Sequence, residues 1–207
     1  MKIDIFSDIV CPWCFIGTER LAQTLESLGM AQTAEVTLHA FMLRSDTPRE
    51  GLNLAEELRA KYGREPREMF ERVESAARES GIALDFSKQP RTYPTQWAHT
   101  LLRHAKAKGT QGALSRALFT AHFQEGRSIA DPEVLRGLAV AHGFTDEEAR
   151  GLLEDPNELA LTEREAEEAR QQGVRGVPFF VFNDQFAMSG AQPESVLREA
   201  IQRASAG

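Results

Sequence analysis

The chain has 207 residues, of which 42% are hydrophobic and 27% are charged, a composition typical of soluble globular proteins. Its net charge of −7 argues against a duplex nucleic-acid binder, because such proteins need a basic face to displace counterions. A chain of this length buries a core of its own, so its stability does not require a disulfide or a structural metal. It contains only two cysteines.

The start of the chain lacks the features of a signal peptide. Asp4 and Asp8 fall where the apolar segment would lie, and no small-residue cleavage site follows. Apolar runs such as 177–182 are far shorter than the ~20 residues that span a membrane. We therefore expect a cytoplasmic protein, in which a close cysteine pair is catalytic, redox-sensing or metal-binding rather than structural.

The first 43 residues predict a β-α-β unit. Apolar residues alternate with polar ones over 1–6 and again over 35–43, which is typical of strands. Residues 12–28 have helical periodicity, and Gly29 stands where a helix C-cap glycine belongs. Because the connection between the two strands is a crossover helix, we expect the strands to be parallel.

The next hundred residues contain no convincing strand and predict a series of helices. Asp131 followed by Pro132 combines a capping carboxylate with a proline at the first helical position. Thr145 and Glu148 have the spacing of a capping box. The expected helix starts are Asn53, Glu65 or Pro66, Tyr93 to Thr95, Thr110, Asp131 and Thr145.

The last fifty residues predict a helix, a hairpin and a second helix. Asp155-Pro156 opens a charged helix that runs to Gln172, a β-hairpin follows over 178–188, and the chain ends in a helix over 193–204. The complete order predicts an α/β protein with a thioredoxin-like fold and a large inserted α-helical domain. The expected domains are 1–44 and 155–207 for the thioredoxin-like part and 45–154 for the inserted part.

The two cysteines form the sequence Cys11-Pro12-Trp13-Cys14 between the first strand and the first helix. Unpaired N–H groups and the helix dipole favour a thiolate at a helix N-terminus. We therefore expect Cys11 to be exposed and to act as the nucleophile, while Cys14, one turn inside the helix, is more buried and resolves the mixed disulfide. Pro12 suits the first helical position, and Trp13 offers an exposed apolar face to a substrate.

Zinc binding and a purely structural role are the alternatives for the cysteine pair. A zinc site needs further ligands, and the chain has no other cysteine. His99 and His104 are five positions apart on an expected helix, so their side chains diverge. We therefore expect no metal and prefer redox chemistry.

Val177 and Pro178 precede the apolar run of the expected hairpin. A proline at this place can simply open a strand where no ladder donor is needed. Few X–Pro bonds are cis, so the sequence alone does not predict a cis bond here.

Several motifs together resemble the DsbA-like family of thioredoxin-fold oxidoreductases, and in particular its cytosolic FrnE-like branch. They are CPWCFIG, AH-x-LL beginning at Ala98, GVPFF and SGAQP, and the likeness runs nearly from end to end. The resemblance implies disulfide exchange with Cys11 as nucleophile and Cys14 as resolving thiol, and a substrate groove with Val177 and cis Pro178. It implies thiol- or disulfide-containing proteins or small molecules as substrates, and no tightly bound cofactor.

One departure from the family pattern concerns proton transfer. Related proteins often carry a buried acid six residues before the first cysteine, where this chain has Ile5 beside Asp4. The proton of the resolving thiol then passes to water or to Asp8. His99, on the inserted helices, either faces the sulfurs or has a local structural partner.

The same fold also resembles kappa-class glutathione transferases and 2-hydroxychromene-2-carboxylate isomerases. These enzymes carry a serine or related hydroxyl at the position of Cys11 and activate glutathione. Their chemistry does not need Cys14, so its presence favours redox exchange. The isomerase reading stays open as the alternative, with glutathione as a candidate co-substrate and a homodimer as a candidate assembly. We expect neither nucleic acid nor a membrane as a partner.

Overall fold

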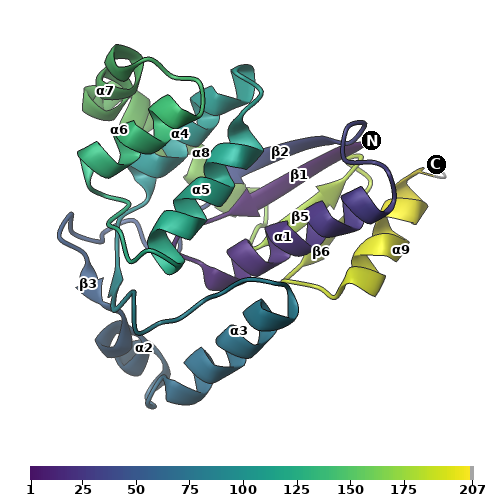
Figure 1. Cartoon of the computed structure of the whole chain (residues 1–207), viewed down its shortest axis with the longest axis horizontal. Coiled ribbons are helices and arrows are strands. Elements are labelled where there is room, and N and C mark those ends of the chain that lie inside the picture. Colours follow the sequence, from purple (N-terminus) through teal and green to yellow (C-terminus); the bar gives the residue numbers. More distant parts are fainter. Residues whose placement is uncertain (206–207) are drawn as a thin grey trace.

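The computed structural model describes residues 1–205, which fold as helices packed around a mixed sheet (Figure 1). The strands are β1 (Lys2–Ser7), β2 (Glu35–Ala40), β3 (Leu52–Asn53), β4 (Arg91–Thr92), β5 (Phe179–Phe182) and β6 (Phe186–Ser189). The helices are α1 (Pro12–Ser27), α2 (Leu54–Tyr62), α3 (Arg67–Glu79), α4 (Gln96–Ala107), α5 (Gln111–Phe123), α6 (Pro132–Ala141), α7 (Asp146–Glu154), α8 (Pro156–Gln171) and α9 (Glu194–Ser205).

The main sheet has the strand order β2-β1-β5-β6. β1 pairs in parallel with β2 and antiparallel with β5, which in turn pairs antiparallel with β6. Asn183, Asp184 and Gln185 connect β5 to β6. The first two have φ angles of 50° and 56°, as the central residues of a type I′ turn require, and the Gln185 N–H closes the turn on the Phe182 carbonyl at 2.9 Å. The expected parallel β-α-β unit and the expected hairpin are therefore confirmed.

Helices cover both faces of this sheet. α1 and α9 pack on one face, and α8 lies against the other (Figure 1). The first interface is filled by alternate strand residues and by one side of each helix: Ile3, Ile5, Phe180, Phe182, Leu21, Leu25, Leu197 and Ile201. This arrangement is the expected thioredoxin-like fold with a helical insertion, which follows β2 and precedes α8.

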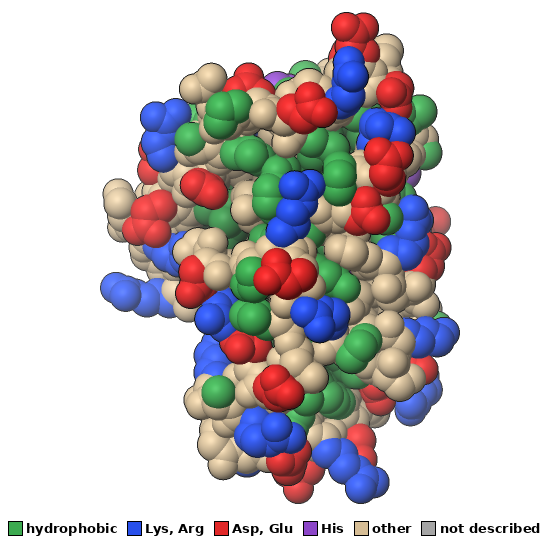
Figure 2. Space-filling model, turned by 90° about the vertical axis from the view of Figure 1, so that its left-hand side faces the viewer, with side chains coloured by type: hydrophobic (Ala, Val, Ile, Leu, Met, Phe, Trp, Pro, Cys, Tyr) green, Lys and Arg blue, Asp and Glu red, His purple; other side chains and the backbone are tan. Residues whose placement is uncertain are grey.

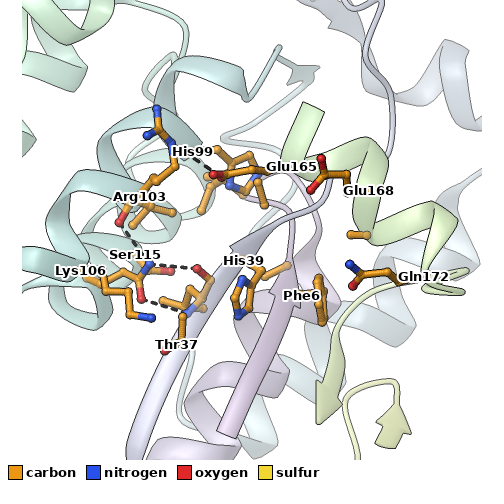
Figure 3. Close-up of a pocket in the computed structure, with 17 residues that line it drawn as sticks. Phe6, Thr37, His39, His99, Arg103, Lys106, Ser115, Glu165, Glu168 and Gln172 are labelled. Carbon is orange, nitrogen blue, oxygen red and sulfur yellow. Dashed lines mark hydrogen bonds and ion pairs between the residues drawn. The ribbon is translucent and has the colours of Figure 1, made fainter. Parts of the chain in front are cut away.

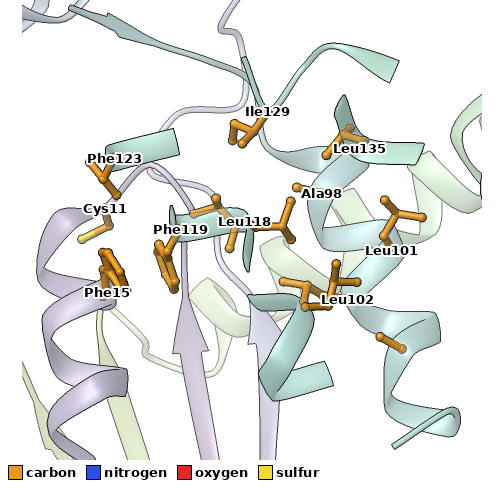
Figure 4. Packing of buried hydrophobic residues seen from close by; sticks show 14 of the residues in the cluster. Cys11, Phe15, Ala98, Leu101, Leu102, Leu118, Phe119, Phe123, Ile129 and Leu135 are labelled. Carbon is orange, nitrogen blue, oxygen red and sulfur yellow. The ribbon is translucent and has the colours of Figure 1, made fainter. Parts of the chain in front are cut away.

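A second core joins α1 to the inserted helices. The rings of Phe15 on α1 and Phe119 on α5 are stacked with centroids 5.0 Å apart. Figure 4 shows Cys11 beside Phe15, with Phe119 and Phe123 close by. Cys14 belongs to the same buried cluster. The cysteine pair therefore lies at the junction between the sheet and the insertion.

The predicted helix caps are present. The Asp131 carboxylate accepts the N–H of Glu133 at 2.9 Å, and Thr145 and Glu148 form a reciprocal capping box. Gly29 has a φ of +67°, the left-handed conformation that favours glycine after a helix. These local signals were readable because each depends only on neighbouring residues.

Two predictions about strands need correction. β2 ends at Ala40 rather than near residue 43, because the chain turns away there and the Leu43 N–H donates to the Asp8 carboxylate at 2.7 Å instead of to a strand. The insertion also contains a short ladder, in which Leu52 pairs with Thr92. Strands of two residues are too short to show any alternation.

Figure 2 shows the face formed by the inserted helices, where acidic and basic side chains are interspersed and hydrophobic ones are scattered.

Over residues 1–205, no helix is both long enough and apolar enough to cross a bilayer. The same residues contain no group of three or more histidine, cysteine or acidic side chains arranged to hold a metal ion.

Candidate active site at the cysteine pair

The backbone around the cysteine pair is a tight turn that leads into α1. Cys11 is the N-cap of α1, with φ −93° and ψ 110°, and Pro12 occupies the first turn. The Cys11 N–H donates to the Asp8 carbonyl at 3.0 Å, and the Cys11 carbonyl accepts the N–H of Cys14 at 3.0 Å. The first cysteine therefore lies at the positive end of the helix, as expected.

The Cys11 side chain is less exposed than expected, since only 5% of the residue is accessible. Its thiol faces the Val177 carbonyl, with 3.7 Å between Sγ and the oxygen. The Val177–Pro178 peptide bond is cis. Sequence reasoning placed Cys11 on an open surface because it could not foresee that the Val177 segment and the inserted helices surround it.

The Cys14 side chain is fully buried, with 0% exposure. The backbone N–H of Asp8 donates to its Sγ at 3.5 Å. Burial raises the pKa of the Cys14 thiol well above its usual value, and the neighbouring Cys11 raises it further, while the Asp8 N–H acts in the opposite direction. Cys14 is therefore held as a thiol in a dry environment.

A cavity of about 810 Å³, here called the front cavity, opens beside Cys11. Pro12, Trp13 and Val177 line it together with Cys11. Its opposite walls come from α2 and α3 and are mainly apolar, with Leu54, Leu58, Met69, Phe70 and Val73. α2 has no buried residue, because its apolar side faces this cavity instead of packing into the core. Arg44, Glu57 and Lys61 add charge to the lining.

The remaining predicted substrate residues differ in exposure. Trp13 is half-buried rather than exposed, and the guanidinium of Arg72 lies 5.8 Å from its ring centroid. Pro178 is buried and packs beside α1, where a Cβ on Gly17 would lie 2.9 Å from its Cγ. The glycine of CPWCFIG therefore allows α1 to approach the Val177–Pro178 segment closely.

Behind Cys14 lies a buried carboxylate that the sequence offered only as one of two options. Asp8 is 1% exposed, and its Oδ1 lies 3.4 Å from His99 Nε2. His99 is itself only 3% exposed. Asp8 is therefore its local partner, and because the Asp8 N–H also donates to Cys14 Sγ, His99 lies near the cysteine pair as well. Asp4, the other acid near the expected position, instead pairs with His39 at 2.7 Å.

A second buried histidine lies near this carboxylate. His122 on α5 is 2% exposed, and its Nδ1 has no hydrogen-bond partner among the described residues. Burial lowers the pKa of His122 to about 3, although the charge of Asp8 acts in the opposite direction. Its ring is therefore neutral at physiological pH. No sequence signal indicated this residue, because α5 carries it far from the cysteines in the chain.

Comparison with known proteins matches this geometry to an established family. A family model described as the DSBA-like thioredoxin domain matches residues 2–202. The solved structure of a probable DsbA oxidoreductase from Streptomyces coelicolor is 33% identical, with a TM-score of 0.89, over 100% of this chain and 90% of its own.

More distant structures share the fold. The cytosolic disulfide reductase DsbM from Pseudomonas aeruginosa, solved with GSH, is 17% identical with a TM-score of 0.71 and covers 100% of both chains. A 2-hydroxychromene-2-carboxylate isomerase is 16% identical with a TM-score of 0.73, over 99% of this chain and 96% of its own.

The matched fold and the cysteine pair at the start of α1 define the class of protein. The chain belongs to the DSBA-like thioredoxin domain family, a family of thiol oxidoreductases.

Proposed function

We propose that this protein is a thiol–disulfide oxidoreductase that uses Cys11 as the attacking thiolate and Cys14 as the resolving thiol. The observation that carries the proposal is the unequal setting of the two sulfurs. Cys11 lies at a helix N-terminus beside the front cavity, whereas Cys14 is fully buried and its pKa is raised by burial. A thiol that attacks must meet substrate, and a thiol that resolves needs to meet only its neighbour.

The cycle that follows from this assignment is balanced in atoms and electrons. The Cys11 thiolate attacks one sulfur of a substrate disulfide, forms a mixed disulfide and releases a thiolate. Cys14 then loses its proton and attacks Cys11 Sγ, which releases the second substrate thiol and leaves a Cys11–Cys14 disulfide. The substrate is reduced and the enzyme is oxidised, and the reverse sequence oxidises a dithiol substrate.

The substrate site in this proposal is the front cavity. Pro12, Trp13 and Val177 line it beside Cys11, and the cis Val177–Pro178 segment lies next to the sulfur. The cavity would be shared by the proposed thioredoxin-like parts, residues 1–44 and 155–207, and the inserted domain, residues 45–154. Its mainly apolar walls suit disulfides of proteins or small molecules that carry an apolar group next to the sulfur.

Glutathione is the proposed candidate co-substrate, and the cytoplasm is the proposed compartment. The supporting observation is the likeness in fold to DsbM, described as a cytosolic disulfide reductase and solved with GSH. Lys61 in the cavity lining offers positive charge to an anionic thiol, whereas Arg44 is paired with Asp46 and Glu57. A homodimer stays a candidate assembly.

The test of this function uses 5,5′-dithiobis(2-nitrobenzoate), a disulfide that releases a coloured thiolate at each step. The reduced wild-type protein should release one equivalent when Cys11 attacks and a second when Cys14 resolves. Cys14→Ser should release only the first and keep the mixed disulfide, which intact mass detects. Cys11→Ser should release none rapidly.

The glutathione-dependent isomerase is the competing function, since the related isomerase structure shares the fold. It predicts that Cys14→Ser keeps the isomerase turnover, because activation of glutathione does not need a second cysteine. If the wild-type protein releases a single equivalent and forms no Cys11–Cys14 disulfide in any glutathione redox buffer, the oxidoreductase proposal fails.

A further inference from the structure

A second cavity of about 390 Å³, here called the rear cavity, shares no lining residue with the front cavity. It is enclosed by β1, β2, α4, α5 and α8, and its lining includes Phe6, Ser7, His39, His99, Arg103 and Glu168. Figure 3 shows His39 from β2, His99 from α4 and Glu168 from α8 around this space. Nothing in the proposed exchange of disulfides at the front cavity uses it.

The buried end of the rear cavity is polar. Ser7 and His99, only 2% and 3% exposed, both line it. The Ser7 hydroxyl makes no hydrogen bond of normal geometry with any described residue. It nevertheless lies close enough to the Cys14 thiol to lower the pKa of that thiol, against the larger effect of burial. An unpartnered buried hydroxyl costs free energy unless water or a proton-transfer partner satisfies it. The cavity is polar and large enough to hold water.

Asp8 links this end of the cavity to Cys14. Its backbone N–H donates to Cys14 Sγ at 3.5 Å, and its side-chain Oδ1 lies 3.4 Å from His99 Nε2. One residue therefore contacts both the resolving sulfur and the histidine that lines the cavity. Ser7 and His99 line the rear cavity, whereas neither of them, nor Asp8, lines the front cavity.

We propose that Ser7, Asp8 and His99 carry the proton of Cys14 between the buried sulfur and water in the rear cavity during the resolving step. This inference rests on the proposed oxidoreductase function. The Cys14 S–H bond breaks, its proton passes by way of the Ser7 hydroxyl and water to the Asp8–His99 pair, and the sulfur's electron pair forms the bond to Cys11 Sγ. The Cys11–substrate S–S bond breaks, and the departing thiolate takes a proton from solvent at the front cavity.

Other ionisable groups also face this pair and set its surroundings. The neutral ring of His122 lies on the α5 side, and the groups around the rear cavity are His39 on β2, Arg103 and Lys106 on α4, and Glu165 and Glu168 on α8. Both signs of charge are present, so the cavity can accept or return a proton without holding a large net charge. This property suits a reaction that runs in either direction.

The experiment separates the two thiolate releases from 5,5′-dithiobis(2-nitrobenzoate) by stopped flow over a range of pH. Asp8→Asn keeps an oxygen for the Leu43 N–H but cannot take up a proton, and His99→Gln keeps a polar side chain. We expect each variant to leave the first release unchanged and to slow the second by about 100-fold at pH 7, the scale of a lost general base. The second release should recover as pH rises, because hydroxide then replaces the pair.

A rescue experiment distinguishes proton transfer from a purely structural role. His99→Ala leaves space next to the rear cavity, so added imidazole should restore the second release in proportion to its concentration. His104→Ala is the matched control on the same helix, since His104 pairs with Glu158 at 2.8 Å and does not line the rear cavity. It should show neither the slow second release nor an effect of imidazole.

The possible failures are distinct. If the wild-type protein shows two releases but Asp8→Asn and His99→Gln keep the wild-type rate and pH profile of the second, the proton route is wrong while the oxidoreductase function stands. If the wild-type protein shows no second release, the oxidoreductase function itself has failed.

Discussion

The two sides of the cysteine pair differ in almost every physical property. On the front side, Cys11 meets a cavity of about 810 Å³ with mainly apolar walls. On the rear side, Cys14 has no exposure and its sulfur accepts the backbone N–H of Asp8, whose buried carboxylate contacts His99. Two identical thiols three positions apart therefore have different environments: Cys11 lines a cavity, whereas burial raises the pKa of Cys14 and holds it as a thiol.

This difference teaches that the spacing of a C-x-x-C motif assigns no roles by itself. The helix start places Cys11 at the positive end of the helix dipole, whereas Cys14 is buried in a cluster that α1 forms with the inserted helices. Phe119 on α5 stacks on Phe15 in the buried cluster that contains Cys14, and α2 and α3 of the insertion line the front cavity. Three predictions test the contrast, ordered from the largest expected effect.

The largest effect is on chemical reactivity. Iodoacetamide at pH 7 should modify Cys11 faster than Cys14 by about 100-fold or more, because burial limits access to Cys14 and keeps its thiol protonated. Peptide mass spectrometry after timed quenching measures the ratio. Cys14→Ser should label at Cys11 with the wild-type rate. Equal labelling of the two cysteines would remove the contrast between the two sides.

The second effect concerns the rear side and pH. Burial holds the pKa of His122 at about 3 in the folded state, against 6.5 for an unperturbed histidine. Since the unfolded chain takes up the proton first, this contribution to stability is complete above pH 6.5 and is lost progressively as the pH falls toward 3. Between pH 7 and 5 the loss is about 2 kcal/mol.

Urea unfolding at pH 7 and pH 5 measures this loss. His122→Leu should lose less stability over the interval than the wild-type protein, because no buried ring then has to be protonated. His142→Gln is the control, since His142 is half-buried and bonds locally to the Leu138 carbonyl. The interval lies above the range in which most carboxylates titrate. An identical pH dependence in His122→Leu and the wild-type protein would contradict the burial of a neutral ring.

The smallest effect concerns the front side. Gly17→Ala places a Cβ at 2.9 Å from Pro178 Cγ and 3.3 Å from Phe180, so α1 must shift away from the Val177–Pro178 segment. Overpacking costs about 1–3 kcal/mol, and the better helix propensity of alanine offsets up to about 1 kcal/mol. We expect a net loss of about 1 kcal/mol by urea unfolding, with slower attack by Cys11. Gly137→Ala, on α6 with no atom near its added Cβ, should not slow this attack.

Much of the fold was determined by local sequence. The helix caps at Asp131 and Thr145, the turn at Asn183-Asp184 and the placement of Cys11 at a helix start all depend on residues that are neighbours in the chain. The resemblance of the motifs to a known family predicted two further features, the family itself and the cis Val177–Pro178 bond, and both are confirmed. The ladder of β3 with β4 escaped prediction, because its two-residue strands lie about 40 positions apart and have no pattern.

The sequence alone thus determined the chemistry that this protein carries: a cysteine pair at a helix start in a thioredoxin-like fold. Only the tertiary structure decided what surrounds each sulfur. The contacts of Cys11 with Val177 and of Asp8 with His99 join residues 166 and 91 positions apart, and the burial of both sulfurs comes from packing between the sheet and the insertion. Local periodicity and capping report on neighbours in the chain, whereas burial and long-range contacts arise only when distant segments pack together.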